Sequence, residues 1–191
     1  MDFSRITLPD LASLIFTVLK ENGINAVLVG GACVSIYSEN QYQSYDLDFV
    51  SYESIKTIEK PLSKLGFKRK GRYFSHERCP YLIDFVNPPI AVGQEPIKKF
   101  KTLKIKSGSL MLLTPEDCVK DRLAAFFHWD DMQALEQALM VAKKHSVNID
   151  AIQSWAKEIA LKSLSSFKNV CNHDFLPAPI TGSAKAVGVE D

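Results

Sequence analysis

Two aspartates separated by one leucine constrain the fold of this chain more than any other feature. In the segment from Ser44 to Val50, Asp46 and Asp48 alternate with Leu47 and Phe49. Residues i and i+2 of a strand project to the same face, so both carboxylates point one way and the apolar side chains point into a core. Unpaired carboxylates this close repel each other, and a divalent cation with oxygen ligands removes that repulsion. The segment therefore predicts a strand that carries a magnesium site.

A pair of glycines, Gly30 and Gly31, follows a short apolar run from Ala26 to Val29. Such a run predicts a strand buried on both faces, and the glycines allow a sharp turn into a short helix from about Ala32 to Tyr37. The free N–H groups and positive dipole end of a helix start suit phosphate oxygens. An ordinary tight turn is the alternative for the glycine pair alone. The acid pair that follows favours phosphate binding.

Asp84 lies in a later strand predicted from Tyr81 to Val86. It shares a strand face with Leu82, where an unpaired carboxylate is costly to bury. We interpret Asp84 as a third metal ligand and as the base that helps to remove a proton from an attacking hydroxyl. In the alternative, it lies at a strand end, where it caps Asn87 or faces water.

The remaining pattern predicts helices and strands on both sides of these motifs. Helices are expected from Thr7 to Gly23, over 51–65 with a kink or early end at Pro61, and from Thr114 to about 167 with breaks near 129–131 and 146–148. Strands are expected over 67–74, with a break at Gly71, and over 101–106 and 110–113, which are expected to form a hairpin around Ser107-Gly108. The predicted fold class is α/β (α+β): a small mixed β-sheet core flanked by helices over 1–113, a C-terminal helical segment over 114–168, and a poorly ordered tail over 169–191.

Charge and cysteine usage narrow the class of protein. A net charge of +1 over 191 residues argues against a strongly electrostatic nucleic-acid binder, yet leaves room for a local basic surface. Two local clusters could follow an RNA backbone: Lys68, Arg69, Lys70 and Arg72, and then Lys98, Lys99, Lys101, Lys104 and Lys106. Lysines that protect an edge strand from aggregation explain the second cluster equally well.

The four cysteines are widely spaced and form no CxxC pair, so a disulfide framework is not indicated. The apolar run from Leu11 to Leu19 is too short to span a bilayer, and no cleavage site follows it. We therefore expect a cytoplasmic protein without a signal peptide.

Taken together, Gly30-Gly31-Ala32, the Ser44-x-Asp46-Leu47-Asp48 segment and the isolated Asp84 resemble the nucleotidyltransferase fold of the DNA polymerase beta superfamily. The resemblance is to the bacterial group that includes AbiEii-like abortive-infection toxins and other minimal nucleotidyltransferases. It covers about Ala26 to Val86, and a C-terminal helical segment is also usual in that superfamily.

The resemblance implies a magnesium-dependent enzyme that transfers a nucleoside monophosphate from a nucleoside triphosphate to an acceptor hydroxyl and releases pyrophosphate. Asp46, Asp48 and Asp84 would bind two Mg²⁺ ions, for which Mn²⁺ could substitute, and the Gly30-Gly31 turn would hold phosphates. Further implications are an RNA, tRNA or protein acceptor and, in a toxin system, an antitoxin partner protein.

Ser44, Lys120 and Arg122 are further candidates for nucleotide binding. Ser44 is either a hydroxyl contact near the acids or a turn residue. Lys120 and Arg122 lie in the first helix of the helical segment, where such folds often direct a cation to the triphosphate. A solvated helix face is the simpler interpretation of these two residues, because long charged side chains usually stay exposed.

Two other functions remain open from the sequence. An acid-x-acid pair also holds the diphosphate of a nucleotide sugar in metal-dependent glycosyltransferases, although the glycine turn and the compact chain disfavour that class. A non-catalytic nucleotidyltransferase-like binding module is the third possibility. For the segment His128 to Asp131 we expect Trp129 to pack between helices and an aspartate to cap the next helix.

Overall fold

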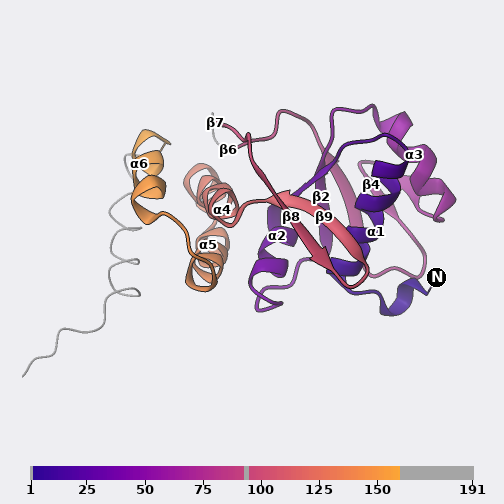
Figure 1. Ribbon diagram of the computed structural model, residues 1–191, viewed down its shortest axis with the longest axis horizontal. Coiled ribbons are helices and arrows are strands. Elements are labelled where there is room, and N and C mark those ends of the chain that lie inside the picture. The colour runs from indigo at the N-terminus through magenta and orange to yellow at the C-terminus, as the bar shows by residue number, and fades with distance from the viewer. Residues whose placement is uncertain (1, 93–94, 160–191) are drawn as a thin grey trace, which may run out of the picture.

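A seven-stranded mixed sheet forms the centre of the protein, whose computed structural model describes residues 2–92 and 95–159 (Figure 1). The strand order is β3-β4-β5-β2-β1-β9-β8. The strands span Val27–Val29 (β1), Asp46–Val50 (β2), Lys68–Lys70 (β3), Tyr73–Ser75 (β4), Leu82–Val86 (β5), Phe100–Ile105 (β8) and Gly108–Leu113 (β9). Strand β2 runs parallel to β5 and antiparallel to β1, and β1 runs parallel to β9. Two short strands, β6 (Ala91–Val92) and β7 (Glu95–Pro96), pair separately.

Six α-helices and one 3₁₀ helix, η1 (Phe3–Arg5), accompany the sheet in the described residues. They span Leu8–Glu21 (α1), Gly30–Tyr37 (α2), Ile55–Lys64 (α3), Pro115–Trp129 (α4), Met132–Lys144 (α5) and Ile149–Ile159 (α6). Side-chain oxygens of Thr7, Ser54, Thr114 and Asp131 accept the N–H of the residue three positions on, which caps α1, α3, α4 and α5. The mixed sheet with flanking helices confirms the predicted fold class.

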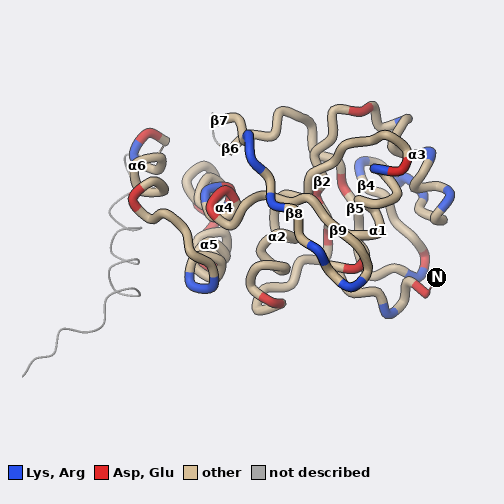
Figure 2. The backbone as a smooth tube through the Cα atoms, in the orientation of Figure 1, with Lys and Arg blue, Asp and Glu red and all other residues tan. Residues whose placement is uncertain are grey.

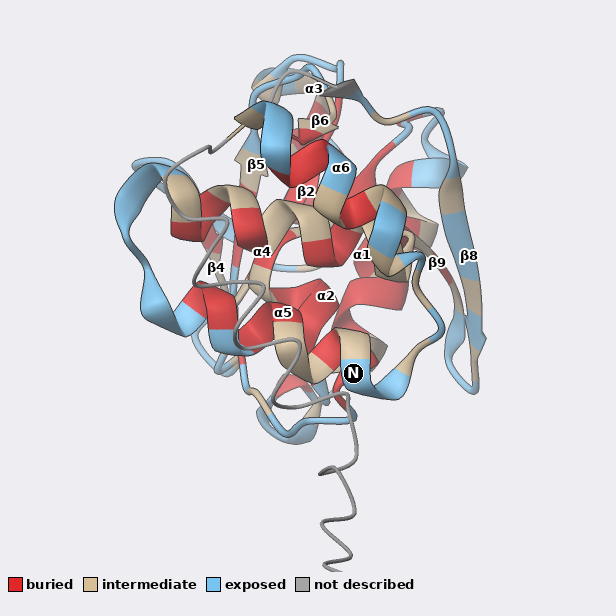
Figure 3. Ribbon diagram, turned by 90° about the vertical axis from the view of Figure 1, so that its left-hand side faces the viewer, coloured by how far each residue is buried: buried red, intermediate tan, exposed pale blue. Residues whose placement is uncertain are grey.

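The central strands β1, β2 and β5 bury most of one face, on which Phe85 alone is partly exposed. Leu28, Leu47, Phe49 and Ile83 have no exposed surface, and they occupy the same face of the sheet by register. Helix α1 packs against β9 and α3, while α4 packs on both α2 and α5. Figure 3 shows α2 largely buried and the edge strand β8 exposed. The glycine turn before α2 therefore lies at the junction of the sheet and the helical segment.

The structure refines two local predictions and contradicts a third. The strand expected over 67–74 with a break at Gly71 is divided there into β3 and β4, which pair as a hairpin because Gly71 has a φ of +63° and reverses the chain. The helix expected over 51–65 does not end early at Pro61, because α3 starts at Ile55, contains Pro61 and continues to Lys64. Trp129 does not pack between helices, since it is the last residue of α4 and its side chain is 77% exposed. The expected capping aspartate is Asp131, whose carboxylate accepts the N–H of Ala134 at 3.1 Å.

The C-terminal predictions are only partly covered by the structure. The chain passes from Leu113 of β9 into α4 at Pro115, and the breaks after α4 and α5 fall where they were expected. The end of the helical segment beyond 159 and the tail over 169–191 lie outside the described residues. No helix in the described ranges has the length and apolar character needed to cross a membrane.

Candidate active site

The three candidate acids share one face of the sheet. In the parallel pair of β2 and β5, Asp48 lies directly opposite Asp84, and Asp46 lies opposite Leu82. Asp48 also lies opposite Val29, the last residue of β1. Paired residues of neighbouring strands project to the same face, so the register places Asp48 beside Asp84, although the two residues are 36 positions apart in the sequence. The structure therefore brings Asp46, Asp48 and Asp84 together.

Gly30 allows the backbone to pass close to Asp48. Its φ is +67°, and a Cβ atom placed on it would lie 2.6 Å from Oδ2 of Asp48, so a larger residue would collide with that carboxylate. The residue before the helix, Val29, provides no side-chain cap for α2. The first N–H groups of α2, beginning at Gly30 and Gly31, are therefore available to an anion beside the acids.

Ser44 orients the first acid of the pair. Its hydroxyl donates to Oδ1 of Asp46 at 2.8 Å, and its own N–H donates to the hydroxyl of Ser35 on α2 at 2.8 Å. A Cβ atom on Gly31 would lie 3.3 Å from Oγ of Ser44, so the glycine pair also leaves room for this serine. The hydroxyl thus links the glycine turn to Asp46.

Asp48 is held in an environment that opposes its negative charge. Burial, as the largest cause, and the neighbouring carboxylates of Asp46 and Asp84 together raise its pKa to about 6, although Arg122 acts in the opposite direction. A rise of this size from 3.8 corresponds to roughly 3 kcal/mol against the ionised form. A cation bound beside Asp48 would remove this penalty.

Asp84 is buried and already has a partner. One carboxylate oxygen lies 2.8 Å from a guanidinium nitrogen of Arg72, and the other accepts the N–H of Phe85 at 2.9 Å. The Arg72 guanidinium also lies over the ring of Tyr73, 4.6 Å from its centre. Asp84 is only 5% exposed, so the alternative in which it faces water or caps Asn87 is wrong.

Helix α4 closes the other side of the site. A cavity of about 360 Å³ is lined by Gly30 and Asp48 from the core and by Asp121, Arg122 and His128 from α4. Two guanidinium nitrogens of Arg122 contact one oxygen of Asp121, at 2.6 and 3.0 Å. Burial alone would lower the pKa of Arg122, but Asp121 outweighs burial and the pKa is raised. Arg122 therefore stays cationic at the edge of the cavity.

Lys120 is placed differently from Arg122. It lines a separate cavity of about 800 Å³ together with Glu116, to which its ammonium lies 3.9 Å away. The side chains of Lys120 and Arg122 are 13% and 19% exposed, so the solvated-face interpretation of both residues is wrong. Of the two candidate cations, only Arg122 lines the cavity that contains Asp48.

Two residues at the site were not assigned to it from the sequence. Asp121 precedes Arg122 on α4, and no spacing rule separates it from any other helical acid. Arg72 was recognised as part of a basic cluster, but its ion pair with Asp84 depends on the turn of the β3–β4 hairpin at Gly71. The Arg72–Asp84 ion pair joins two different strands, and the place of Asp121 at the site depends on how α4 packs beside Gly30 and Asp48.

The donor set fits a divalent cation in its chemistry. Three carboxylates share one face, and the repulsion that raises the pKa of Asp48 is the kind that a cation relieves. As the side chains stand, no group of three or more His, Cys, Asp or Glu residues within 2–92 and 95–159 is arranged to hold a metal ion. Asp84 would have to exchange Arg72 for the cation before all three acids could act as ligands.

Comparison with known proteins supports the same fold. A family described as nucleotidyl transferase of unknown function (DUF2204) matches residues 8–66, which include the glycine turn and both acids of β2. No curated protein matches the chain significantly. A crystal structure of an antigenic nucleotidyltransferase-like protein from Paracoccidioides brasiliensis superposes with a TM-score of 0.60 at 12% identity, covering 84% of this chain and 92% of that chain.

Two antibiotic-modifying proteins give weaker structural matches. The antibiotic-resistance factor ANT(2'')-Ia matches with a TM-score of 0.47 at 13% identity, over 91% of this chain and 94% of that chain. The lincosamide antibiotic adenylyltransferase LnuA, with lincomycin bound, matches with a TM-score of 0.44 at 14% identity, over 71% of this chain and 98% of that chain. The family match and the first structure confirm the nucleotidyltransferase fold that the resemblance implied. The chain therefore has the nucleotidyltransferase fold. The family that matches residues 8–66 is described as nucleotidyl transferase, which is the enzyme class predicted from the sequence.

Proposed function

We propose that the protein is a magnesium-dependent nucleotidyltransferase that moves a nucleoside monophosphate from a nucleoside triphosphate to an acceptor hydroxyl. The observation that carries this proposal is the register of β2 and β5, which sets Asp48 opposite Asp84, with Gly30 against Asp48. Carboxylates beside free helix N–H groups provide ligands for cations and for phosphates at one place.

Each residue has a role that follows from its position. The N–H groups at Gly30 and Gly31 would bind phosphate oxygens of the triphosphate, and Ser44 would keep Asp46 oriented. Arg122 would add a positive charge at the cavity edge. This arrangement suits phosphoryl transfer, which depends mainly on positioning and on neutralisation of charge.

The acids would hold the cations and accept the proton of the acceptor. Two Mg²⁺ ions, or Mn²⁺ in their place, would neutralise the phosphates and stabilise the entering and leaving oxygens. Asp84 would take the proton as the acceptor oxygen bonds to the α-phosphorus. The bond from the α-phosphorus to the oxygen bridging to the β-phosphate breaks, and pyrophosphate leaves.

The identity of the acceptor and the physiological role form the finer part of the proposal. We propose RNA, including tRNA, as the acceptor, with a protein acceptor as the competing outcome. The resemblance to AbiEii-like toxins is the basis for a toxin-system role with an antitoxin partner. A growth arrest on expression that Asp46→Asn abolishes would support that role.

Labelled triphosphates test the activity directly. Purified protein with magnesium, each labelled nucleoside triphosphate, and total cellular RNA or protein should give a labelled acceptor. We expect Asp46→Asn to reduce labelling by roughly 10³-fold, because metal charge stabilisation contributes several kcal/mol to the transition state. The matched control is Glu53→Gln, an exposed acid beyond the end of β2, which should leave labelling unchanged. Full labelling by Asp46→Asn would refute the proposed role of Asp46.

The same preparation separates the other two functions. A binding module without turnover would give no labelled acceptor, and calorimetry would show no binding of magnesium with any nucleotide at millimolar concentrations. A metal-dependent glycosyltransferase would hydrolyse nucleotide sugars and leave free triphosphates intact.

A further inference from the structure

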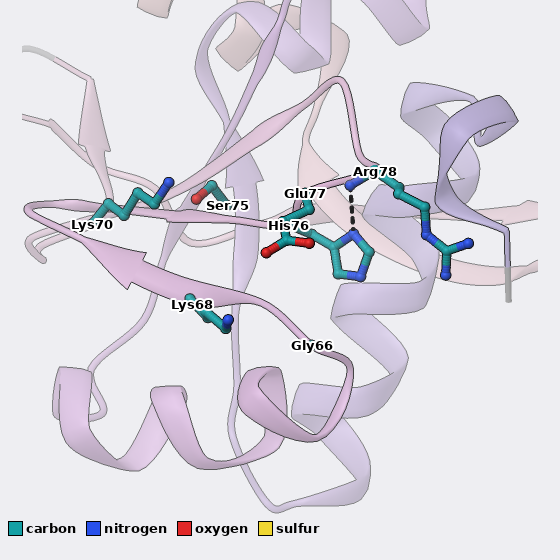
Figure 4. A pocket seen from close by; sticks show the side chains of 7 residues that line it. All are labelled: Gly66, Lys68, Lys70, Ser75, His76, Glu77 and Arg78. Carbon is teal, nitrogen blue, oxygen red and sulfur yellow. Dashed lines mark hydrogen bonds between the residues drawn. The ribbon is translucent and has the colours of Figure 1, made fainter.

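A second polar cavity lies at the edge of the sheet, away from the acids. It has a volume of about 590 Å³ and is lined by Lys68, Lys70, Ser75, His76, Glu77 and Arg78, with Gly66 at one side (Figure 4). Its volume falls in the range of small-ligand sites. Nothing in the proposed transfer reaction uses this cavity.

Four side chains besides Arg78 can donate hydrogen bonds into the cavity. Lys68 and Lys70 are exposed residues i and i+2 of β3, so their ammonium groups project from the same face. Ser75 lies opposite Lys68 in the hairpin and adds a hydroxyl. No ion pair to either lysine is found among the described residues, so both ammonium groups are available to an anion.

His76 supplies the fourth donor. The N–H of Arg78 donates to Nδ1 of His76 at 3.1 Å, so the neutral ring carries its proton on Nε2. A Cβ atom on Gly66 would lie 3.1 Å from that Nε2, and the glycine leaves this side of the ring open. Arg78 extends away from Lys68 and Lys70 on the other side of the His76 ring (Figure 4). The donors on the open side are therefore the two lysines, the serine and the histidine.

Register places this cavity on the same face of the sheet as the acids. Asp48 pairs with Asp84, Asp84 with Tyr73, and Tyr73 with Lys70, which makes one continuous row across four strands. Strands are spaced by about 4.8 Å, so the backbone of β3 lies roughly 10 Å from that of β5. Arg72 and Tyr73 lie between the two sites.

We propose that this cavity binds a phosphate group of the acceptor, while the acceptor hydroxyl lies at Asp84. The inference rests on the proposed function, because it makes the acceptor a phosphate-bearing molecule that extends from the acids across β4 to β3. A single RNA strand and a phosphorylated small molecule both present this chemistry. The cavity also contains the carboxylate of Glu77, which weakens anion binding, so removal of this charge should strengthen the binding of a phosphate.

Binding can be measured without catalysis. A fluorescently labelled single-stranded RNA oligonucleotide and, in a second arm, a labelled sugar phosphate are titrated by anisotropy at several salt concentrations, with chelator and without triphosphate. The test variant is Lys68→Gln/Lys70→Gln. The matched control is Lys101→Gln/Lys104→Gln, which removes two exposed lysines from β8 at the opposite edge of the sheet (Figure 2).

The test variant should bind RNA about tenfold more weakly, and the slope of log affinity against log salt should fall by about 0.7 for the loss of one neutralised phosphate on a single strand. The control variant should bind within about twofold of the unmodified protein, and Glu77→Gln should bind RNA more tightly. A lysine-dependent loss confined to the sugar phosphate would identify the small phosphorylated acceptor as the source.

Equal losses in the two double variants, or binding of neither probe, would overturn the proposal. Asp46→Asn separates this failure from a failure of the proposed function, because it should lose nucleotidyl transfer and keep lysine-dependent binding. If Lys68→Gln/Lys70→Gln left phosphate binding unchanged while nucleotidyl transfer persisted, the phosphate cavity alone would be refuted. If the unmodified protein showed lysine-dependent phosphate binding but no nucleotidyl transfer, the proposed enzyme activity alone would be refuted.

Discussion

The two faces of β2 and β5 differ although their residues alternate along the same short strands. One face carries Leu47, Phe49 and Ile83, which are completely buried. The other face carries the acids, with Asp48 and Asp84 paired across the two strands. The apolar face removes side chains from water and stabilises the fold, whereas the acid face concentrates like charges and costs stability.

This difference shows how a fold can hold an unfavourable site. Strand alternation anchors each acid by apolar neighbours on the opposite face, so repulsion between the carboxylates cannot move one strand without exposing the core. In the proposed function, cations bound at the acid face neutralise these charges. The following changes test whether stability and chemistry are divided between the two faces in this way.

The largest expected effect on stability comes from the apolar face. Leu47→Ala should lower the free energy of unfolding by about 2–5 kcal/mol, because it leaves a cavity at a completely buried position. The matched change on the acid face is Leu82→Ala, at a position that is 39% exposed, and it should cost less than about 1 kcal/mol. Urea unfolding measures both variants. Equal losses would show that the two faces do not differ in packing.

Replacing Asp48 by a neutral side chain should instead increase the free energy of unfolding. Asp48→Asn should raise the free energy of unfolding by about 1–3 kcal/mol at pH 8 with chelator, because folding raises the pKa of Asp48 from 3.8 to about 6 and the ionised form is penalised. Well below pH 3.8 Asp48 is protonated in both the folded and the unfolded protein, so the gain should vanish there, grow as the pH rises from 3.8 to about 6, and stay constant above. Thermal or urea unfolding across this range measures it. A gain that is independent of pH would contradict the electrostatic account.

The smallest expected effect concerns Arg72, whose guanidinium forms an ion pair with Asp84. Arg72→Gln should tighten Mn²⁺ binding by about threefold to tenfold, because the metal no longer has to displace a guanidinium from Asp84. Electron paramagnetic resonance of Mn²⁺ without nucleotide measures the affinity. Arg69→Gln is the control, since the Nε of Arg69 donates to the carbonyl of Gly71 and not to an acid. Weaker metal binding by Arg72→Gln would mean that Arg72 supports the acids and does not compete for them.

Much of the fold could be predicted because its signals are local. Thr7, Thr114 and Asp131 act as helix caps over three residues, and the alternation around Leu47 identifies β2 over five. The break at Gly71 was predicted, but the pairing of β3 with β4 as a hairpin was not, because the basic stretch around Gly71 has no apolar alternation that identifies two separate strands. Trp129 was assigned to the core by its residue type, whereas its place at the end of α4 leaves it exposed.

The sequence by itself identified the residues that we propose to carry the chemistry: a glycine turn, an alternating acid pair and a third acid on a later strand. It could do so because φ freedom, strand alternation and capping depend on residues within a few positions of one another. Only the tertiary structure decided that Asp84 lies opposite Asp48 and that Arg72 forms an ion pair with Asp84. It also decided that Arg122, and not Lys120, lines the cavity beside Gly30. These contacts follow from strand register and helix packing between distant segments, which no local pattern encodes.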